Sequence, residues 1–589
     1  MRNGIPTSDG DRFHELPWDR PVSRRDIFRY GGALGFGAVG ASLLASCGPV
    51  AQLTASGDFA KPGTTPPAKA KYLVVLIVDA GRGDYLGYGH LPNIKSLIAN
   101  GTYYPNAFSG IMEATTPACH VALGTGSFPK NNGGVLGFWW ENSSDEKYSC
   151  ANLADPATGS AAIDPNTIET LIREAGAPTM AALLKDVDPT AKVYTSSGVK
   201  FYAADAVGGP EADYITYFWN DGPNMYRPLS IPGHQALPAS ILNDPSLTSN
   251  DWYSMTTDSP GLQDALVVDL ATKVIERERP RIVILNLPEM DWPVAHLYGG
   301  PADAPAVTQL MENADKQLGK LMDLYRNLGI FHETVFCLMG DHGVLPLERQ
   351  VNTADIPGAV ANAGTTINTG DFHTGGFLWI NDPTRAMKAS TYIDDLKEPG
   401  VSAAYFLGDI AGQRTYLPSP QTASRITPQL DNAYRYLLET MNGANAPHVV
   451  LLYEERTGTL GAGGNYPWKG DHGGASWASQ GVALTMAGPG IRRGYRSQHP
   501  ARLVDLAPTF LRLLGAPYPS MDGVALADAF ASPTAEELTA QTDLAREIVP
   551  VAATLRRQSL LDVKGARVKS TTSALKKTAE KNIPLNPNY

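Results

Sequence analysis

Aspartate and histidine residues recur where apolar runs of the sequence end, and both residue types bind metal ions. The set comprises Asp79, Asp291, His296, Asp341, His342 and His472. Imidazole and carboxylate ligands together suit zinc best. Each motif alone is weak evidence, but all of them occur in one chain and most follow an apolar run. The sequence therefore predicts a centre of two divalent metal ions, with Zn²⁺ as the first choice.

A threonine before a proline supplies a candidate nucleophile. Thr116 is followed by Pro117, a pair that is typical of a helix start with threonine at the N-cap. A hydroxyl there lies at the positive end of the helix dipole, where an anionic phosphoryl group is stabilised. Taken alone, the pattern describes an ordinary helix cap more often than a nucleophile. The predicted metal-binding residues make a nucleophile the favoured interpretation of Thr116.

The combination of a hydroxyl and two metal ions indicates phosphoryl chemistry. Two ions about 4 Å apart can hold one phosphoryl oxygen between them. One ion would lower the pKa of the Thr116 hydroxyl, and the other would stabilise the leaving oxygen and then generate hydroxide. Hydroxide would hydrolyse a phospho-threonine, so no separate general base is needed.

Continuous apolar runs must position these residues. Residues 71–78, 281–287 and 334–339 are apolar without alternation, which favours parallel strands buried on both faces. Ligand-binding residues in such sheets sit at the carboxyl ends of the strands. Residues 306–328 carry apolar side chains at helical spacing on one face. We expect an α/β fold, a mostly parallel central sheet with helices on both faces.

The chain divides into several predicted regions. The catalytic core is expected at 71–350 and 468–530. Residues 351–467 form a mixed segment with its own strands, which indicates a cap or inserted subdomain. Residues 531–589 form a C-terminal extension whose basic end, 556–581, we expect to be solvated and partly irregular.

The N-terminus carries an export pattern. Residues 23–28, SRRDIF, match a twin-arginine signal. The apolar run that follows is shorter than the roughly 20 residues that a spanning helix needs. It ends in Leu-Ala-Ser-Cys at Cys47, which resembles a lipobox. We predict a signal peptide at 1–46, lipidation of Cys47, a flexible tether at 47–70 and a periplasmic or cell-surface location anchored to the membrane. A plain signal peptide is the alternative.

Bulk composition excludes two classes of protein. The net charge of −11 argues against a general nucleic-acid binder. Four cysteines in 589 residues do not form a disulfide framework. The expected partner, from the metal-binding residues and the Thr116 hydroxyl, is a small-molecule phosphate ester.

Taken in order, these motifs resemble the alkaline phosphatase superfamily, and within it the nucleotide pyrophosphatase/phosphodiesterase group. The resemblance covers most of the chain from Lys71 to about Leu526. It includes Asp79 with Arg82, Asp84 and Tyr85, Thr116 with His120 and the 123–126 turn, Glu289 to Asp291 with His296 and Gly299, Asp341 to Gly343, His472 with Gly473, Asp505 to Thr509 and Met521 to Gly523. The resemblance implies an alkaline-phosphatase-like fold. It also implies one zinc ion held by Asp291, His296 and His472, and a second held by Asp79, Asp341, His342 and the Thr116 oxygen.

The sequence departs from the family pattern at the nucleophile and at one ligand pair. The superfamily often leaves one residue between the nucleophile and proline, which would select Thr115. The spacing to His120 favours Thr116 instead. The interval between Asp291 and His296 is one residue longer than the usual pattern.

The substrate-binding positions are mixed. Phe138 stands where the family commonly has a phosphate-binding asparagine, and Asn142 is a possible substitute. Lys200 and Tyr202 match a Lys-x-Arg pair of monoester-specific members, with the lysine kept and the arginine lost. From the residues alone, a solvated surface lysine is an equal alternative for Lys200. Phe138 and the two tryptophans after it could form an apolar wall for a second ester substituent.

These features favour a metal-dependent hydrolase of phosphodiesters or nucleotide pyrophosphates. A phosphomonoesterase is the alternative, supported by Lys200. A phospho-group transferase and a non-catalytic surface lipoprotein are further alternatives. A sulfatase is disfavoured because the segment from Thr115 to Cys119 lacks the Cys/Ser-x-Pro-x-Arg motif.

Overall fold

The computed structural model describes residues 70–137, 139–141, 147–149, 167–220, 226–248, 261–459 and 468–578. All of them belong to one compact unit, Ala55–Tyr589. The predicted signal peptide, tether and lipidation site at Cys47 lie outside the described residues. So do Phe138 and Asn142.

The centre of the fold is a nine-stranded sheet of order β21-β2-β20-β10-β1-β9-β6-β7-β8. Its two short strands at one edge are β21 (Tyr495–Arg496) and β2 (Thr102–Tyr103). Its middle strands are β10 (Thr334–Gly340), β1 (Tyr72–Val78), β9 (Ile282–Leu287), β6 (Val193–Ser196) and β7 (Tyr214–Asn220). These five pair in parallel, while β8 (Tyr226–Ser230) and β20 (Leu484–Ala487) pair antiparallel at their neighbours. The mostly parallel sheet predicted from the three apolar runs is confirmed.

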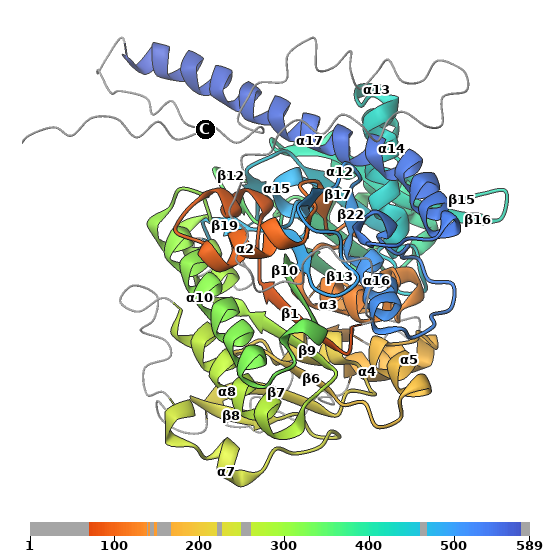
Figure 1. Cartoon of the computed structure of the whole chain (residues 1–589). Helices are drawn as coiled ribbons and strands as arrows, with labels where there is room; N and C mark the ends of the chain where they lie inside the picture. The colour runs from red at the N-terminus through yellow and green to blue at the C-terminus, as the bar shows by residue number, and fades with distance from the viewer. Residues whose placement is uncertain are drawn as a thin grey trace, which may run out of the picture. The chain divides into compact units, whose positions relative to one another are not determined.

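Both faces of the sheet are covered, which explains the unbroken apolar runs. In β1, Leu73, Val75 and Ile77 contribute to one core and the alternate residues contribute to another. The first core contains α3 (Thr116–Thr125), α4 (Thr167–Ala175), α5 (Met180–Val187) and α16 (Leu506–Leu514). The second contains α2 (Pro92–Asn100), α8 (Leu262–Glu278) and α10 (Pro305–Asn327). Figure 1 shows these two helix layers on opposite sides of the strands.

A second, smaller sheet lies within the segment predicted to be an insertion. Its order is β13-β14-β17-β15-β16, from β13 (Ile367–Phe372), β14 (Gly375–Ile380), β15 (Val401–Ile410), β16 (Gln413–Pro418) and β17 (Val449–Tyr453). Neighbouring strands all run antiparallel. Helices α11 (Ile356–Asn362) and α12 (Ala386–Asp395) share a separate apolar core with this sheet. The tip of the β13–β14 hairpin contacts the first sheet's ligand loops, because the Thr374 N–H donates to the His472 carbonyl at 3.2 Å.

The C-terminal extension forms one long helix, α17 (Ala535–Thr578). Ile548, Val551 and Leu555 are buried at helical spacing, and Ile548 packs against Phe108. This apolar stripe docks the helix on the core, and the helix continues through the basic residues as far as Thr578.

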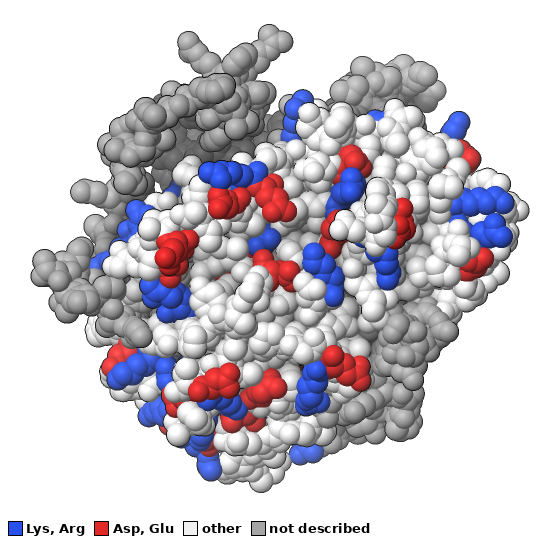
Figure 2. Space-filling model, turned by 90° about the vertical axis from the view of Figure 1, so that its right-hand side faces the viewer, with Lys and Arg blue, Asp and Glu red and all other residues white. Residues whose placement is uncertain are grey.

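The face of the molecule shown in Figure 2 carries charged side chains of both signs. Lysine and arginine side chains there are interspersed with aspartate and glutamate. None of the described helices combines the length and the apolar character needed to cross a membrane.

Candidate active site

The adjacent parallel strands β1 and β10 end at the same level and place Asp79 close to Asp341. In the register of the sheet, Val78 at the end of β1 pairs with Gly340 at the end of β10. Asp79 and Asp341 follow these residues directly. The Ala80 N–H donates to Asp341 Oδ1 at 3.0 Å. The two carboxylates therefore leave neighbouring strands at the same level.

Asp291 and His296 follow the other neighbour of β1. They lie in a short kinked turn of π-helical type, Asp291–Ala295, and in α9 (His296–Tyr298). A π-helical turn brings residues five apart together. His296 Nε2 lies 3.4 Å from Asp291 Oδ2. The helical turn thus accommodates the extra residue between the two side chains.

Three imidazoles present the same nitrogen to the carboxylates. Nδ1–H of His296 donates to the Gly470 carbonyl at 2.9 Å, and Nδ1–H of His342 donates to the Gly343 carbonyl at 2.9 Å. Nδ1–H of His472 donates to the Ala114 carbonyl at 3.2 Å. These bonds fix the tautomer and leave each Nε2 as a lone-pair donor.

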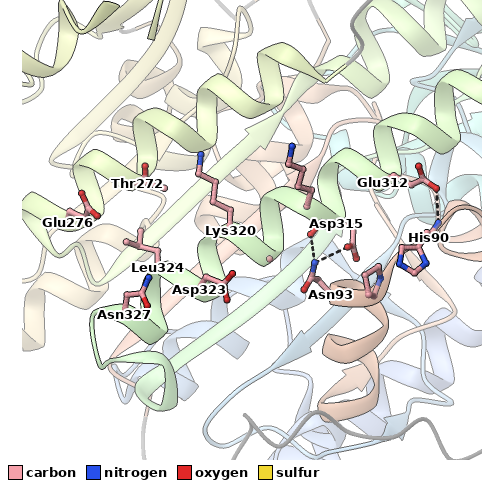
Figure 3. A pocket seen from close by; sticks show the side chains of 13 residues that line it. His90, Asn93, Thr272, Glu276, Glu312, Asp315, Lys320, Asp323, Leu324 and Asn327 are labelled. Carbon is pink, nitrogen blue, oxygen red and sulfur yellow. Dashed lines mark hydrogen bonds between the residues drawn. The ribbon is translucent and has the colours of Figure 1, made fainter. Parts of the chain in front are cut away.

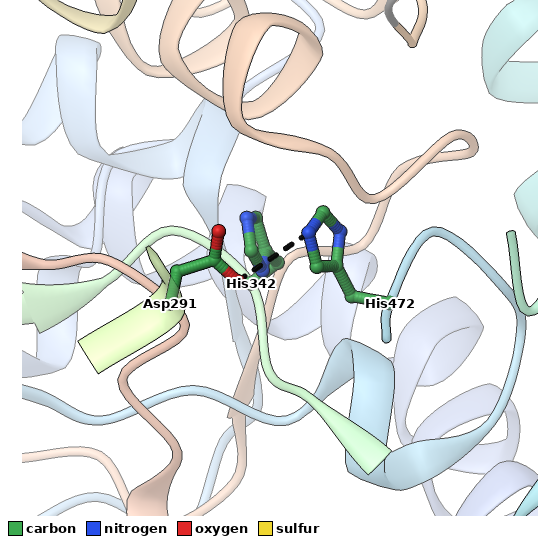
Figure 4. A group of neighbouring side chains, drawn as sticks. All are labelled: Asp291, His342 and His472. Carbon is green, nitrogen blue, oxygen red and sulfur yellow. Dashed lines mark ion pairs between the residues drawn. The ribbon is translucent and has the colours of Figure 1, made fainter. Parts of the chain in front are cut away.

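The Nε2 atoms point toward buried carboxylate oxygens. His472 Nε2 lies 3.5 Å from Asp291 Oδ1, and His342 Nε2 lies 3.4 Å from Asp341 Oδ2 and 3.6 Å from Asp79 Oδ1. Figure 4 shows Asp291, His342 and His472 turned toward one another. The side chains that can share a metal ion form the groups Asp291–His342–His472, His296–Asp471–His472 and Asp79–Asp341–His342.

The donor atoms fit divalent metal ions. Asp291 Oδ1 and Asp341 Oδ2 are buried and have no hydrogen-bond donor among the described residues. Burial, with the neighbouring Asp79 carboxylate, raises the pKa of Asp341 to about 8. An unpaired buried carboxylate is costly, and a cation offsets that cost. Carboxylate oxygens beside imidazole Nε2 atoms are a ligand set that suits zinc.

Thr116 begins helix α3 and faces this centre. Thr115, with φ −121° and ψ 160°, occupies the N-cap position that we predicted for Thr116. Thr116 Oγ1 lies 3.1 Å from His342 Nε2 and 3.4 Å from Asp79 Oδ1. Thr115 Oγ1 instead donates to the Leu136 carbonyl at 3.1 Å.

Lys200 lies between the two acidic groups. Its Nζ donates to Asp291 Oδ2 at 2.6 Å, to Asp79 Oδ1 at 2.9 Å and to Thr116 Oγ1 at 3.2 Å. Burial alone would lower the pKa of Lys200, but Asp291 and Asp79 hold it well above its usual value. The alternative of a solvated surface lysine is therefore wrong. Tyr202, two residues further along α6 (Phe201–Gly208), packs edge-on against Phe201 with 5.4 Å between ring centroids.

Comparison with known proteins supplies the family. A family model described as type I phosphodiesterase / nucleotide pyrophosphatase matches residues 73–461. The chain belongs to this family. The match includes every predicted metal ligand except His472. No curated protein matches the sequence.

Solved structures with the same fold include family and superfamily members. Murine ectonucleotide pyrophosphatase/phosphodiesterase 5 is 14% identical, with a TM-score of 0.51 over 77% of this chain and 97% of that chain. The human protein of the same name is 15% identical, with a TM-score of 0.51 over 78% and 100%. Alkaline phosphatase PafA is 16% identical, with a TM-score of 0.60 over 79% and 100%. The chain is a phosphoric ester hydrolase with an alkaline-phosphatase-like fold.

Two polar residues that the sequence analysis did not assign support the centre of this phosphodiesterase-family enzyme. Nδ1–H of His120 donates to the Thr116 carbonyl at 2.8 Å. The Asn286 amide donates to Asp79 Oδ2 at 3.0 Å. The signal for Asn286 was available, because it is the one polar residue in the apolar run of β9.

A surface groove lies apart from the phosphodiesterase centre. It has a volume of about 940 Å³ and is lined by residues of α2, α8 and α10 such as Asn93, Glu276 and Glu312. Figure 3 shows its polar side chains, including Asp315 and Lys320. No residue of the Asp and His centre lines this groove, so it is not the place of the chemistry.

Proposed function

We propose that this enzyme hydrolyses phosphodiesters or nucleotide pyrophosphates by way of a phospho-threonine at Thr116. The single observation that carries the proposal is the position of Thr116 Oγ1, within 3.4 Å of Asp79, Lys200 and His342 at the buried end of the sheet. A hydroxyl surrounded by metal-ligand side chains is suited to attack a phosphorus atom.

Two divalent ions, with Zn²⁺ as the first choice, would be held by the predicted ligands. Asp291, His296 and His472 would hold one ion, and Asp79, Asp341, His342 and Thr116 the other. When bound, such ions polarise phosphoryl oxygens and lower the pKa of a nearby hydroxyl.

The protein's own groups position the nucleophile. Thr116 lies in the first turn of α3, where the free N–H groups and helix dipole favour an anionic phosphoryl group. The Lys200 ammonium donates to Thr116 Oγ1 and would stabilise negative charge there or on a phosphoryl oxygen. His120 fixes the backbone carbonyl of Thr116.

One relative supports a nucleotide substrate and a threonine nucleophile. The murine relative was solved with AMP in an inactive variant in which a threonine is replaced by alanine. We extend that nucleotide binding and that need for a threonine to this chain and to Thr116. Phe138 and the tryptophans after it remain our proposed apolar wall for the nucleoside, with Asn142 and Tyr202 as proposed polar contacts.

A phosphomonoesterase is the second candidate. It is favoured by Lys200, because a buried ammonium beside the nucleophile can bind the extra negative charge of a monoester. The fold likeness to alkaline phosphatase PafA is compatible with this activity.

The deciding experiment compares hydrolysis of a nitrophenyl phosphate monoester with that of a nitrophenyl nucleotide diester. Zinc-loaded protein is used, with Thr116→Ala as the blank. A faster diester reaction that Thr116→Ala abolishes supports the proposal, and a faster monoester reaction selects the second candidate. Activity that survives in Thr116→Ala would remove Thr116 from the mechanism.

We also propose that the enzyme is exported by the twin-arginine route and anchored through a lipid on Cys47. The export pattern and lipobox-like sequence support this location. Replacement of Cys47 by alanine should release the protein from the membrane fraction. An unchanged distribution would exclude the anchor.

A further inference from the structure

A second cluster of buried titratable side chains lies beside the centre already described. It contains Glu113, Asp371 and His373, whose ligand atoms all lie within 4.8 Å of one another. Glu113 is three residues before Thr116. Asp371 and His373 come from the tip of the β13–β14 hairpin in the smaller sheet. None of these residues serves in the proposed hydrolysis.

The cluster contains carboxylate oxygens that lack hydrogen-bond donors. Glu113 is fully buried, and neither of its carboxylate oxygens is paired with a described residue by a hydrogen bond of ordinary geometry. A contact from the Gly137 backbone N–H favours the charged form of Glu113, but burial outweighs it and raises the pKa of Glu113 well above its usual value. Asp371 is 6% exposed, and its Oδ2 also lacks a donor in the described part of the chain. Such atoms are expensive to bury unless a cation or a proton neutralises them.

Glycine at position 137 keeps the space between these carboxylates open. A Cβ atom built on Gly137 would lie 2.5 Å from Glu113 Oε2 and would also clash with Asp371 Oδ2. Any side chain at this position would therefore fill the space that the two carboxylates share. Glu113 Oε2 and Asp371 Oδ2 therefore face a shared space beside the pair of His373 and Asp371.

The His373 ring is oriented in the way that metal-binding histidines usually are. Its Nε2 lies 3.2 Å from Asp371 Oδ1, and its Nδ1 lies 3.3 Å from Asp471 Oδ1. Asp471 is fully buried. A carboxylate that accepts the Nδ1 proton leaves Nε2 as the ligand atom and raises its basicity.

We propose that Glu113, Asp371 and His373 Nε2 bind a third divalent metal ion, with Asp471 orienting the histidine. The two carboxylates balance the charge of the ion. Two carboxylates with one imidazole match Mn²⁺ best, because carboxylate oxygen suits Mn²⁺ while a single imidazole is compatible with it. The remaining coordination positions would be filled by water.

The ion would act as a structural clamp between the two sheets. The His373 and His472 rings lie nearly parallel, with 6.0 Å between centroids and 8° between planes. Thr374, next to His373, binds the His472 carbonyl and, through its hydroxyl, the Gly474 N–H at 2.9 Å. Fixing the hairpin therefore fixes the backbone that carries His472. His373 and Asp371 are positioning residues in this scheme.

Metal content tests the proposal directly. The full chain is purified without chelator, equilibrated with Zn²⁺ and Mn²⁺, desalted and analysed by elemental mass spectrometry. We expect about three ions per chain in the parent, and one fewer in Asp371→Asn and in Glu113→Gln. The exposed Asp355, in the same part of the chain, gives the matched control Asp355→Asn, which should keep all three.

A spectroscopic measurement identifies the ligand. Mn²⁺ in the parent should show a nitrogen coupling in its electron spin echo spectrum, and His373→Gln should lose it. Gly137→Ala leaves every proposed ligand in place and should still lose the ion. It replaces Asp371→Asn or Glu113→Gln as the test if either of those variants fails to fold. Two ions in the parent under these conditions, or an unchanged content in both Asp371→Asn and Gly137→Ala, would overturn the proposal.

The proposed third metal site and the proposed hydrolysis can be tested independently. Thr116→Ala should lose turnover while it keeps the Mn²⁺ signal with its nitrogen coupling. If turnover survives in that variant but the signal is present, the proposed nucleophile fails and the third site stands.

Discussion

The hydroxyls of Thr115 and Thr116 belong to adjacent residues but lie in different surroundings. Thr115 Oγ1 donates to the Leu136 carbonyl at 3.1 Å, whereas Thr116 Oγ1 lies 3.1 Å from His342 Nε2. The helix start separates them, because Thr115 has extended backbone angles and Thr116 is the first helical residue. One hydroxyl is engaged by the backbone and the other faces the metal-ligand side chains.

Alanine substitutions at these two positions should therefore have different effects. Thr116→Ala removes the proposed nucleophile, and we expect kcat to fall by about a thousandfold or more. Thr115→Ala removes one neutral hydrogen bond, so we expect a stability loss of about 1 kcal/mol with little change in kcat. Steady-state hydrolysis of a nitrophenyl diester and urea unfolding measure the two effects.

A serine at position 116 provides the matched control, because it keeps the hydroxyl. Thr116→Ser should retain measurable activity. Equal loss of activity in Thr115→Ala and Thr116→Ala would contradict the assignment of separate roles.

The ammonium of Lys200 should matter most to stability when metal is absent. Lys200→Met leaves the Asp79 and Asp291 carboxylates unpaired in metal-free protein, which costs about 3 kcal/mol for a buried pair. Bound metal ions would neutralise the same carboxylates and reduce that cost. The measurement is urea unfolding of parent and Lys200→Met, each with excess chelator and with zinc.

Lys185, which pairs with Asp213 at 2.9 Å and not with a predicted metal ligand, gives a control. Lys185→Met should lower stability equally with and without zinc. If Lys200→Met also proved insensitive to zinc, the predicted ions would not be neutralising Asp79 and Asp291.

The buried strands and the ligand residues at their carboxyl ends could be predicted from the sequence. The runs that form β1, β9 and β10 are apolar because both faces of the sheet are covered, and strand ends carry the ligands in such folds. These two facts place Asp79, Asp291 and Asp341 at the same edge of the sheet, whereas the adjacency of β1 and β10 comes from the structure. The same pattern led to the α/β class and to the family, which the family match bears out.

Several features depend on packing that sequence spacing does not record. The π-helical turn between Asp291 and His296 reflects local backbone geometry, of which only an unusual interval is visible in the sequence. Lys200 appeared as a possible surface residue because nothing local shows that α6 begins beside two carboxylates. His373 and Glu113 are 260 residues apart, and only the folded hairpin brings them together.

Glu289 should stabilise the turn that carries Asp291. Its carboxylate accepts the Gly261 N–H at 3.1 Å and the Asp264 N–H at 3.0 Å, at the start of α8. Glu289→Ala removes both bonds, and we expect a loss of about 2 kcal/mol in stability. It should also lower zinc occupancy, because Asp291 lies two residues further along the chain. Unfolding and metal titration test these effects, and unchanged zinc affinity with lowered stability would limit Glu289 to capping α8.

The pair of His234 and Glu169 should make stability depend on pH. His234 Nε2 lies 2.5 Å from Glu169 Oε1, and Nδ1–H donates to the Ala212 carbonyl at 2.8 Å. Burial lowers the pKa of His234, but the hydrogen bond to Glu169 outweighs burial and raises it above 6.5. The folded protein therefore favours the charged imidazole. Its stabilisation is fully present below the unfolded pKa and is lost as pH rises through the folded pKa.

His234→Gln should therefore cost more stability at pH 6 than at pH 9, by about 1 kcal/mol. Urea unfolding at the two pH values measures the difference, and His332→Gln, at an exposed histidine, is the control. Arg173 donates to the other Glu169 oxygen at 2.9 Å. A cost for His234→Gln that is equal at both pH values would mean that the imidazole is neutral in the folded protein, and the Glu169 contact would then contribute as a neutral hydrogen bond.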